Sequence, residues 1–295
     1  MIKRFLMRLA TIFGSFSPPW VVKALAFLFS TLAFLLLKNQ RRRIEKNLLY
    51  ITGKNSKSLS FRLFQNFGLC IAHFLQSPTL VNKILPYCRF DLTTLRRAEK
   101  KGKGVILLTA HFGNWELGGI LLAKIGLPLS VIVEPIQEKL FATYNYYRSR
   151  FGLEVIPYNQ PRKLLSAIKS RRIVVFLADR SLSKKGVLVP FFGKMRVFPK
   201  GPAYFSLKYG VPIIPGYVLL STSPFFLSGR KEKKERYFYH LVTEGEITYH
   251  PTGNFEQDVE ELTKLISQRI EGWIREHPTQ WFVFEAEWQD GKGEG

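Results

Sequence analysis

Residues 105–119 read VILLTAHFGNWELGG, and this stretch decides the fold. The apolar run Val105–Leu108 is typical of a buried strand, and a helical pattern begins near Glu116. Five helical residues turn the chain through about 500°, so His111 and Glu116 would point to different faces of one regular helix. They can meet if His111 lies on the strand-to-helix loop, Gly113 makes the turn and Glu116 stands in the first helical turn. This arrangement predicts an imidazole general base oriented by a carboxylate, with no serine or cysteine nucleophile beside it.

Strands and helices alternate from Gly104 onward, which predicts an α/β fold with a mixed central sheet flanked by helices. The predicted strands are Val105–Leu108, Leu129–Val133, Glu154–Ile156 and Ile173–Leu177. The predicted helices are Ser58–Gln76, Trp115–Ala123, Lys139–Phe151, Lys163–Lys169, Gly201–Tyr209 and Glu256–His277.

Two later segments are expected to contain further strands. Val211–Leu220 contains Pro212 and Pro215, which predicts a strand that is irregular or near an edge of the sheet, since proline lacks an N–H group for a ladder. Tyr237–Thr243 and Glu246–His250 suggest a hairpin.

The N-terminal region predicts attachment to a membrane. Residues 2–16 have an amphipathic pattern, and Trp20–Leu37 is almost wholly apolar, long enough for a helix of about 27 Å. No small-residue cleavage site of a signal peptide follows. The basic cluster Lys38–Arg43 favours a catalytic domain on the cytoplasmic side, although a helix lying on the membrane or a buried core helix fits the same pattern. We therefore expect a membrane-anchoring segment at residues 1–45 and a catalytic domain at residues 46–295.

The chain of 295 residues has 44 basic and 22 acidic residues, a formal net charge of +22. Such a charge attracts anionic partners: nucleic acid, anionic lipid head groups or acidic proteins. The basic runs Arg41–Arg43 and Lys231–Arg236 keep a nucleic-acid-binding protein as an alternative. We expect no nucleic acid as partner, because helix-turn-helix, zinc-finger and RNP-type motifs are absent from the sequence.

The cysteines and histidines favour neither a disulfide framework nor a metal site. Cys70 and Cys88 form no CxxC pair, which fits a reducing cytosolic face. His111 lacks the histidine partner of metalloprotease helices, and the other histidines are scattered without ligand spacing, so a metal hydrolase is a weak alternative. We predict no metal and no cofactor.

Charged residues beyond the first motif are candidates for the same site. Asp179 and Arg180 follow the strand Ile173–Leu177, so we expect them at its carboxyl end beside His111, although a surface pair is the alternative. Arg148 could bind a phosphate or stabilise negative charge, or be a solvated helix arginine. Lys200 precedes a helix framed by proline and glycine, which suits an anionic group but also fits a simple loop–helix junction.

The motif from His111 to Glu116 matches the HX4[D/E] signature of the glycerolipid and glycolipid acyltransferase superfamily. HFGNWE resembles the lipid A biosynthesis (lauroyl/myristoyl) acyltransferases. The block VPFFG at residues 189–193 is similar to the same family and to the phosphatidylinositol mannoside acyltransferases. Glu285-Ala286-Glu287-Trp288 departs from it, since many relatives have a basic His-Arg stretch before this tryptophan.

The resemblance implies a glycerol-3-phosphate acyltransferase-like fold and direct acyl transfer, in which the histidine deprotonates an acceptor hydroxyl that attacks an acyl thioester. We therefore expect a membrane-associated O-acyltransferase of lipid A and lipopolysaccharide biosynthesis at the cell inner membrane. Its partners would be an acyl carrier protein as donor, an anionic glycolipid as acceptor and the anionic membrane. The expected catalytic residues are His111, Glu116, Arg148 and Asp179; the expected substrate-binding residues are Asn114, Arg180, Arg196, Lys200 and Gly201.

A second reading keeps this chemistry and changes the substrates. The acceptor would then be a phosphatidylinositol mannoside, a lysophospholipid or glycerol phosphate, with acyl-CoA as donor. The sequence does not decide between the two.

Overall fold

The computed structural model describes residues 17–134, 139–181, 185–220 and 238–289. The predicted amphipathic helix at residues 2–16 and the basic run Lys231–Arg236 lie outside these residues.

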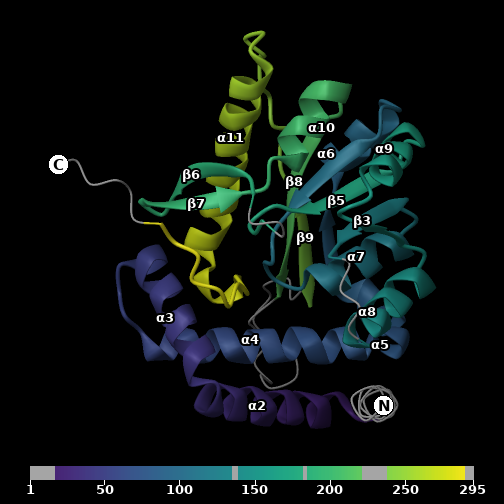
Figure 1. The fold of residues 1–295 in the computed structure, drawn as a ribbon. Helices are drawn as coiled ribbons and strands as arrows, with labels where there is room; N and C mark the ends of the chain where they lie inside the picture. The colour runs from purple at the N-terminus through teal and green to yellow at the C-terminus, as the bar shows by residue number, and fades with distance from the viewer. Residues whose placement is uncertain (1–16, 135–138, 182–184, 221–237, 290–295) are drawn as a thin grey trace, which may run out of the picture.

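A seven-stranded sheet with the order β1-β9-β8-β2-β5-β3-β4 forms the centre of the described chain (Figure 1). Every neighbouring pair is parallel except β8 and β9, so the sheet is mixed, as predicted. The strands are β1 (Cys88–Asp91), β2 (Val105–Thr109), β3 (Leu129–Val133), β4 (Glu154–Pro157), β5 (Ile173–Leu177), β8 (Ile213–Leu220) and β9 (Tyr239–Thr243).

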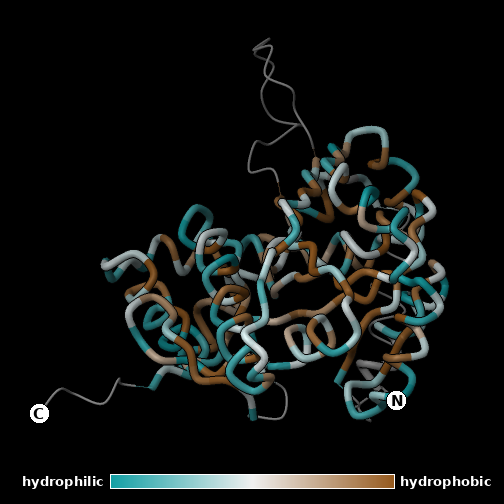
Figure 2. Tube along the Cα trace, turned by 90° about the horizontal axis from the view of Figure 1, so that it is seen from above, coloured by the Kyte–Doolittle hydropathy of each residue, from teal (hydrophilic) through white to brown (hydrophobic). Residues whose placement is uncertain are grey.

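Helices cover both faces of the sheet, because its central strands are apolar on both. Leu107 of β2 packs in one buried cluster with α4, α6 and α7, whereas its neighbours Ile106 and Leu108 pack in another with α9, α10 and α11. Each such fully buried side chain contributes about 1.5–3 kcal/mol. In Figure 2, long hydrophobic stretches run through the middle of the body. The helices are α2 (Pro19–Leu36), α3 (Lys38–Thr52), α4 (Lys57–Leu75), α5 (Ser77–Ile84), α6 (Thr93–Lys100), α7 (Trp115–Lys124), α8 (Lys139–Arg150), α9 (Pro161–Lys169), α10 (Gly201–Tyr209) and α11 (Phe255–Glu276).

The prediction that the strand around Pro212 and Pro215 is irregular or near an edge is wrong, because β8 is one continuous strand and two further strands, β9 and β1, separate it from the edge. β8 lies inside the sheet between β9 and β2. Pro212 precedes the strand, and its carbonyl accepts a hydrogen bond from the amide of Ile106. Pro215 is the last β8 residue paired with β2, and pairing with β9 begins at Gly216. The prolines therefore stand where a missing N–H group costs little.

The predicted hairpin of Tyr237–Thr243 with Glu246–His250 is also absent. β9 pairs antiparallel with β8 and parallel with β1, and residues 246–250 form no strand. A separate antiparallel hairpin, β6 (Val187–Phe191) with β7 (Lys194–Phe198), contains the VPFFG block. Its Phe191 packs on Trp281 and Trp288 of the C-terminal segment.

The apolar N-terminal stretch forms α2, and the chain then bends by 92° into α3. Arg41 of α3 donates a hydrogen bond to the carbonyl of Phe34, which stabilises the end of α2. Within the described ranges no individual helix is long and apolar enough to cross a bilayer, whereas this bent pair passes on combined length and composition. α2 lies alongside α4 below the sheet in Figure 1.

One face of α2 exposes large apolar side chains to the outside. They are Trp20, Phe27, Leu28, Phe29, Leu32, Leu35 and Leu36. A contiguous apolar surface of this kind marks a contact with a membrane or a partner, and it suggests that the helix pair associates with a membrane.

Candidate active site

The register of two neighbouring strands brings His111 and Asp179 together. β2 and β5 are parallel, and Thr109 stands opposite Leu177. Two residues further along each strand come His111 and Asp179. The distance between His111 Nδ1 and Asp179 Oδ1 is 2.9 Å. The site therefore lies at the carboxyl ends of the central strands, as predicted for Asp179.

Asp179 is fully buried and accepts three hydrogen bonds. Besides the imidazole of His111, its carboxylate binds the His111 amide at 3.1 Å and the indole Nε1 of Trp281 at 2.8 Å. Burial alone raises the pKa of this carboxyl group. The charge and hydrogen bonds of His111, with the Trp281 donor, outweigh burial and hold the pKa below its usual value. Asp179 is therefore ionised, and an ionised carboxylate only accepts, so His111 Nδ1 is the donor.

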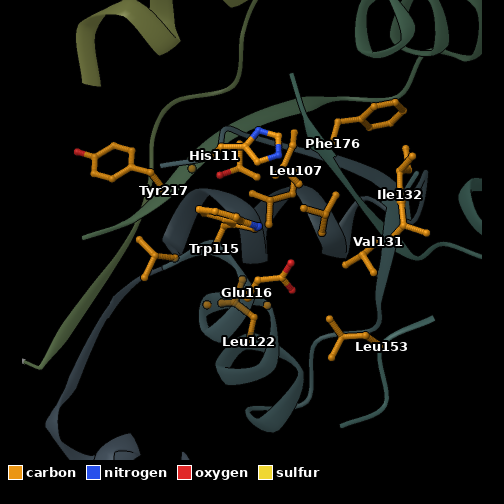
Figure 3. A pocket seen from close by; sticks show the side chains of 18 of the residues that line it. Leu107, His111, Trp115, Glu116, Leu122, Val131, Ile132, Leu153, Phe176 and Tyr217 are labelled. Atoms are coloured by element: carbon orange, nitrogen blue, oxygen red, sulfur yellow. The ribbon is translucent and has the colours of Figure 1, made fainter. Parts of the chain in front are cut away.

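This tautomer leaves Nε2 of His111 as the acceptor nitrogen, and the residue lines a large cavity. Trp115 packs edge-on against the imidazole, with ring centroids 5.2 Å apart. Figure 3 shows both rings at the cavity, together with Glu116 on the far side of Trp115. The histidine is thus fixed from one side by a carboxylate and from another by an aromatic ring.

The backbone after His111 is held by the C-terminal segment. The carbonyl of His111 accepts from the amide of Phe282, and the amide of Gly113 donates to the carbonyl of Gln280. Gly113 has a φ of +59°, and a Cβ there would lie 1.5 Å from the carbonyl oxygen of Val218, so only glycine fits. The side chain of Gln280 binds both the amide and the carbonyl of Leu220.

The structure corrects the predicted role of Glu116. Its carboxylate binds Arg148, with Nε donating to Oε2 at 3.0 Å and a second bond from the same guanidinium to Oε1. Asp179, and not Glu116, orients His111. The prediction failed because Glu116 projects from the first turn of α7 toward α8, on the other side of Trp115.

Arg148 lines the cavity but is already engaged. Its guanidinium also donates to Asn145 at 2.7 Å, so three of its five N–H groups are used. The edge of the guanidinium that could bind an anion through two parallel hydrogen bonds is occupied by Glu116. A bidentate phosphate complex, one of the predicted roles, is therefore not available at this side chain while the ion pair stands. The remaining N–H groups can still bind an oxygen.

The cavity beside His111 has a volume of about 620 Å³ and an apolar lining for most of its surface. It reaches from His111 past Glu116 to the sheet and to α7 (Figure 3). Apolar side chains of the sheet and helices form its wall, among them Leu107, Leu122, Val131, Leu153 and Phe176. A cavity of this size and polarity suits the hydrocarbon chain of a substrate.

Three of the five predicted substrate-binding residues line this cavity: Asn114, Arg180 and Gly201. Asn114 is buried and structural as well, since it caps α7 and its amide group donates to Cys70 and Tyr239. Arg180 forms ion pairs with Glu134 at 3.6 Å and Glu285 at 3.2 Å. Lys200 is exposed at the start of α10 and does not belong to the cavity lining.

Arg196 is buried to 99% and does not line the cavity, contrary to the prediction that it binds substrate. Its guanidinium lies over the rings of Trp281 and Trp288, 5.4 and 5.3 Å from their centroids. None of its three nitrogen atoms has a hydrogen-bond partner in the described part of the chain. Burial lowers the pKa of Arg196, and nearby Asp179 opposes that effect.

Trp281 and Gln280 are site residues that the sequence reasoning missed. Both lie near the C-terminal end of the described chain, about 170 residues after His111. No periodic pattern links such distant positions, and only the fold brings them to the histidine.

The described residues contain no cluster of three or more His, Cys, Asp or Glu side chains that could hold a metal ion.

The match to known proteins extends over almost the whole chain. A family model described as bacterial lipid A biosynthesis acyltransferase matches residues 5–290. The chain belongs to the lipid A biosynthesis acyltransferase family. The family predicted from the sequence is thereby confirmed.

Among individual relatives of this acyltransferase family, two mycobacterial proteins are similar to the chain. The phosphatidylinositol mannoside acyltransferase of Mycolicibacterium smegmatis is 24% identical over 204 residues, 67% of this chain and 61% of the relative. That of Mycobacterium tuberculosis is 27% identical over 203 residues, 67% and 58% respectively. The lipid A biosynthesis acyltransferase of Haemophilus influenzae is 23% identical over 196 residues, 64% and 55%. The match therefore spans about three-fifths of the length of the mycobacterial relatives.

Proposed function

We propose that this protein transfers a fatty acyl group from an acyl thioester to a hydroxyl of an anionic glycolipid at a membrane. The observation that carries the proposal is the hydrogen-bonded pair of His111 and Asp179, whose histidine lines a large and mostly apolar cavity. Membership of the family agrees with it. A base beside an apolar cavity is what direct transfer of a fatty chain to an alcohol requires.

In this mechanism Nε2 of His111 removes the proton from the acceptor hydroxyl. The oxygen attacks the thioester carbonyl carbon, forms the new C–O bond and gives a tetrahedral oxyanion. Collapse breaks the C–S bond, and the proton on His111 passes to the leaving thiolate. Asp179 holds the correct tautomer and stabilises the imidazolium that forms in between.

The pair of Glu116 and Arg148 is proposed to act on the substrates and not on His111. Arg148 has N–H groups left over after its bonds to Glu116 and Asn145, and these can stabilise the oxyanion. Glu116 fixes the guanidinium in place, since a two-bond ion pair allows it little freedom. Arg180 and the start of α10 at Lys200 and Gly201 are proposed to bind the anionic part of a substrate.

The donor and acceptor follow from charge and from the relatives. We propose an acyl carrier protein as donor, because a chain with a net charge of +22 attracts an acidic carrier. A lipid A precursor at the cytoplasmic side of the cell inner membrane is the first acceptor we propose. A phosphatidylinositol mannoside, with acyl-CoA as donor, is the second, because relatives with that name share 24–27% identity.

A matrix of donors and acceptors tests the proposal. Purified protein is incubated with radiolabelled acyl-acyl carrier protein or acyl-CoA and with a lipid A precursor, a phosphatidylinositol mannoside or a lysophospholipid. We expect transfer to one glycolipid and its loss in His111→Ala. Turnover that persists in purified, folded His111→Ala, or transfer to no lipid hydroxyl, would contradict the proposal.

A further inference from the structure

A second hollow of about 360 Å³ runs between α2 and α4. On α2 its lining recurs every three or four residues from Val22 to Leu37, and on α4 from Phe64 to Gln76. Each set forms one stripe along its helix, so the hollow follows the contact of the two helices for about 22 Å. It is an elongated groove and not a round pocket.

The groove is chemically suited to hydrocarbon alone. Its lining is apolar apart from Ser30 and Gln76, and the Ser30 hydroxyl already has two acceptors within hydrogen-bond distance for its single proton, the Ala26 carbonyl and Gln65 Oε1. Gly68 lets the two helices approach closely at Ser30, and the small side chains of Ala33 and Ala72 leave room beside that contact for a chain. Among the described residues no charged side chain lines it, so they offer a head group no binding site inside the groove.

The groove adjoins the catalytic cavity at α4. Phe67 and Ile71 line both hollows, so α4 is their common wall. Figure 1 shows α4 between α2 and the sheet. On its other side, the groove borders the exposed apolar face of α2, where Phe29 lines the groove and is 63% exposed. The groove thus lies between a surface suited to a bilayer and the reactive histidine.

We propose that the α2–α4 groove binds an acyl chain that the acceptor glycolipid already carries, while the cavity beside His111 holds the chain that is transferred. This inference rests on the proposed function. A lipid acceptor must bring a hydroxyl to His111 while its own chains stay out of water. An apolar groove that shares residues with the catalytic cavity and faces the membrane side of α2 satisfies both needs.

The groove is tested first by labelling, which needs no turnover. The probe is phosphatidylinositol with a diazirine at the end of one acyl chain, in phosphatidylglycerol vesicles, and the donor probe is an acyl-CoA with a terminal diazirine. We expect the first to label α2 and α4 around Ala33 and Ala72, and the second to label the sheet cavity around Leu107 and Leu122.

Two variants fill the groove from opposite walls, Ala33→Phe and Ala72→Phe. Each should lower lipid labelling of the groove by about tenfold, the effect of losing one apolar contact worth about 1.4 kcal/mol. Ala24→Phe is the matched control, because Ala24 is exposed on the same helix and does not line the groove. Unchanged labelling of the groove in both filled variants would overturn the proposal. So would equal labelling of outward residues such as Leu28. These results would indicate that α2 is immersed in the bilayer as a whole, or that another segment occupies the groove.

Transfer assays then distinguish an effect on acceptor binding in the groove from an effect on the acyl-transfer reaction. For the filled variants we expect a KM about tenfold higher for an acylated acceptor, with no change for the same head group after its chains are removed. Equal loss with both acceptors would overturn the groove proposal. Wild-type protein that labels in the groove but transfers no acyl group would instead count against the proposed function alone.

Discussion

Nδ1 of His111 lies 2.9 Å from Oδ1 of Asp179, at matching positions beyond two parallel strands. In Asp179→Asn the amide carbonyl would accept the bonds from Trp281 and the His111 amide, and its NH2 group would face Nδ1. The imidazole would then carry its proton on Nε2 and could no longer act as a base. We expect kcat to fall by about 10²–10⁴-fold with little change in KM. Steady-state kinetics on folded protein, checked by circular dichroism, measures this effect; kcat within threefold of wild type would contradict it.

Glu116 and Arg148 should behave as one unit. Glu116→Gln removes the charge that fixes the guanidinium, and Arg148→Met removes the guanidinium itself. We expect the double variant to lose no more activity than the worse single variant, with a coupling energy of about 1–3 kcal/mol in a double-mutant cycle on kcat/KM. Additive losses would show that the two residues act independently.

Alanine variants of Gly113 and Gly126 distinguish the cost of backbone strain from the cost of a steric clash. Both have positive φ, but a Cβ at position 126 meets nothing within 4 Å, whereas one at position 113 would overlap the Val218 carbonyl. Gly126→Ala should cost about 1–2 kcal/mol of unfolding free energy. Gly113→Ala should cost more than about 4 kcal/mol. Urea unfolding in detergent compares the two, and equal losses would refute the clash.

His73 should make the protein less stable in mild acid. Burial, helped by the charge of Lys23, lowers the pKa of this histidine to about 4, and Tyr239 donates a hydrogen bond to its neutral ring. The unfolded state therefore binds more protons between about pH 6.5 and 4, so stability is complete above that range and falls as the pH is lowered through it. The full loss is about 3 kcal/mol. His73→Gln, which keeps a partner for Tyr239 without a titration, should flatten the dependence of the urea midpoint on pH.

Arg196 should be replaceable by an apolar side chain of similar length. Its buried guanidinium has no hydrogen-bond partner among the described residues, so its removal costs packing but recovers the cost of burying a charge. Arg196→Met should leave the free energy of unfolding unchanged or raise it by up to about 2 kcal/mol, with KM within twofold of wild type. Arg196→Ala is the control, since it leaves a cavity between Trp281 and Trp288 and should destabilise the protein. A large rise in KM for Arg196→Met alone would show contact with substrate.

The sequence was sufficient for the elements whose patterns are local. Leu129–Val133, Ile173–Leu177 and Gly201–Tyr209 have the predicted bounds, because strand-like and helical apolar patterns are read within a few residues. The carboxyl-end position of His111 also followed from local pattern, since a strand, a glycine turn and a helix stand in sequence there.

Pairing between distant strands could not be read in this way. Nothing local says that β2 lies beside β5, and only that adjacency makes Asp179, not Glu116, the partner of His111. The prediction from Pro215 failed for the same reason. A proline disrupts an inner strand only where its N–H group would have donated to a neighbouring strand. At Pro215 the strand changes its partner from β2 to β9, so no such hydrogen bond is lost. Trp281 became a site residue through contacts that no spacing encodes.

The backbone hydrogen bonds between the C-terminal segment and the loop after His111 have a consequence for biosynthesis. Phe282 and Gln280 supply backbone bonds to both sides of Phe112, and they follow it by about 170 residues, so they leave the ribosome long after it. The apolar α2, in contrast, is exposed to solvent or lipid hundreds of residues earlier. A nascent chain can therefore reach the bilayer long before the loop after His111 is fixed, and translation itself delays the onset of catalysis until residues 280–282 have emerged.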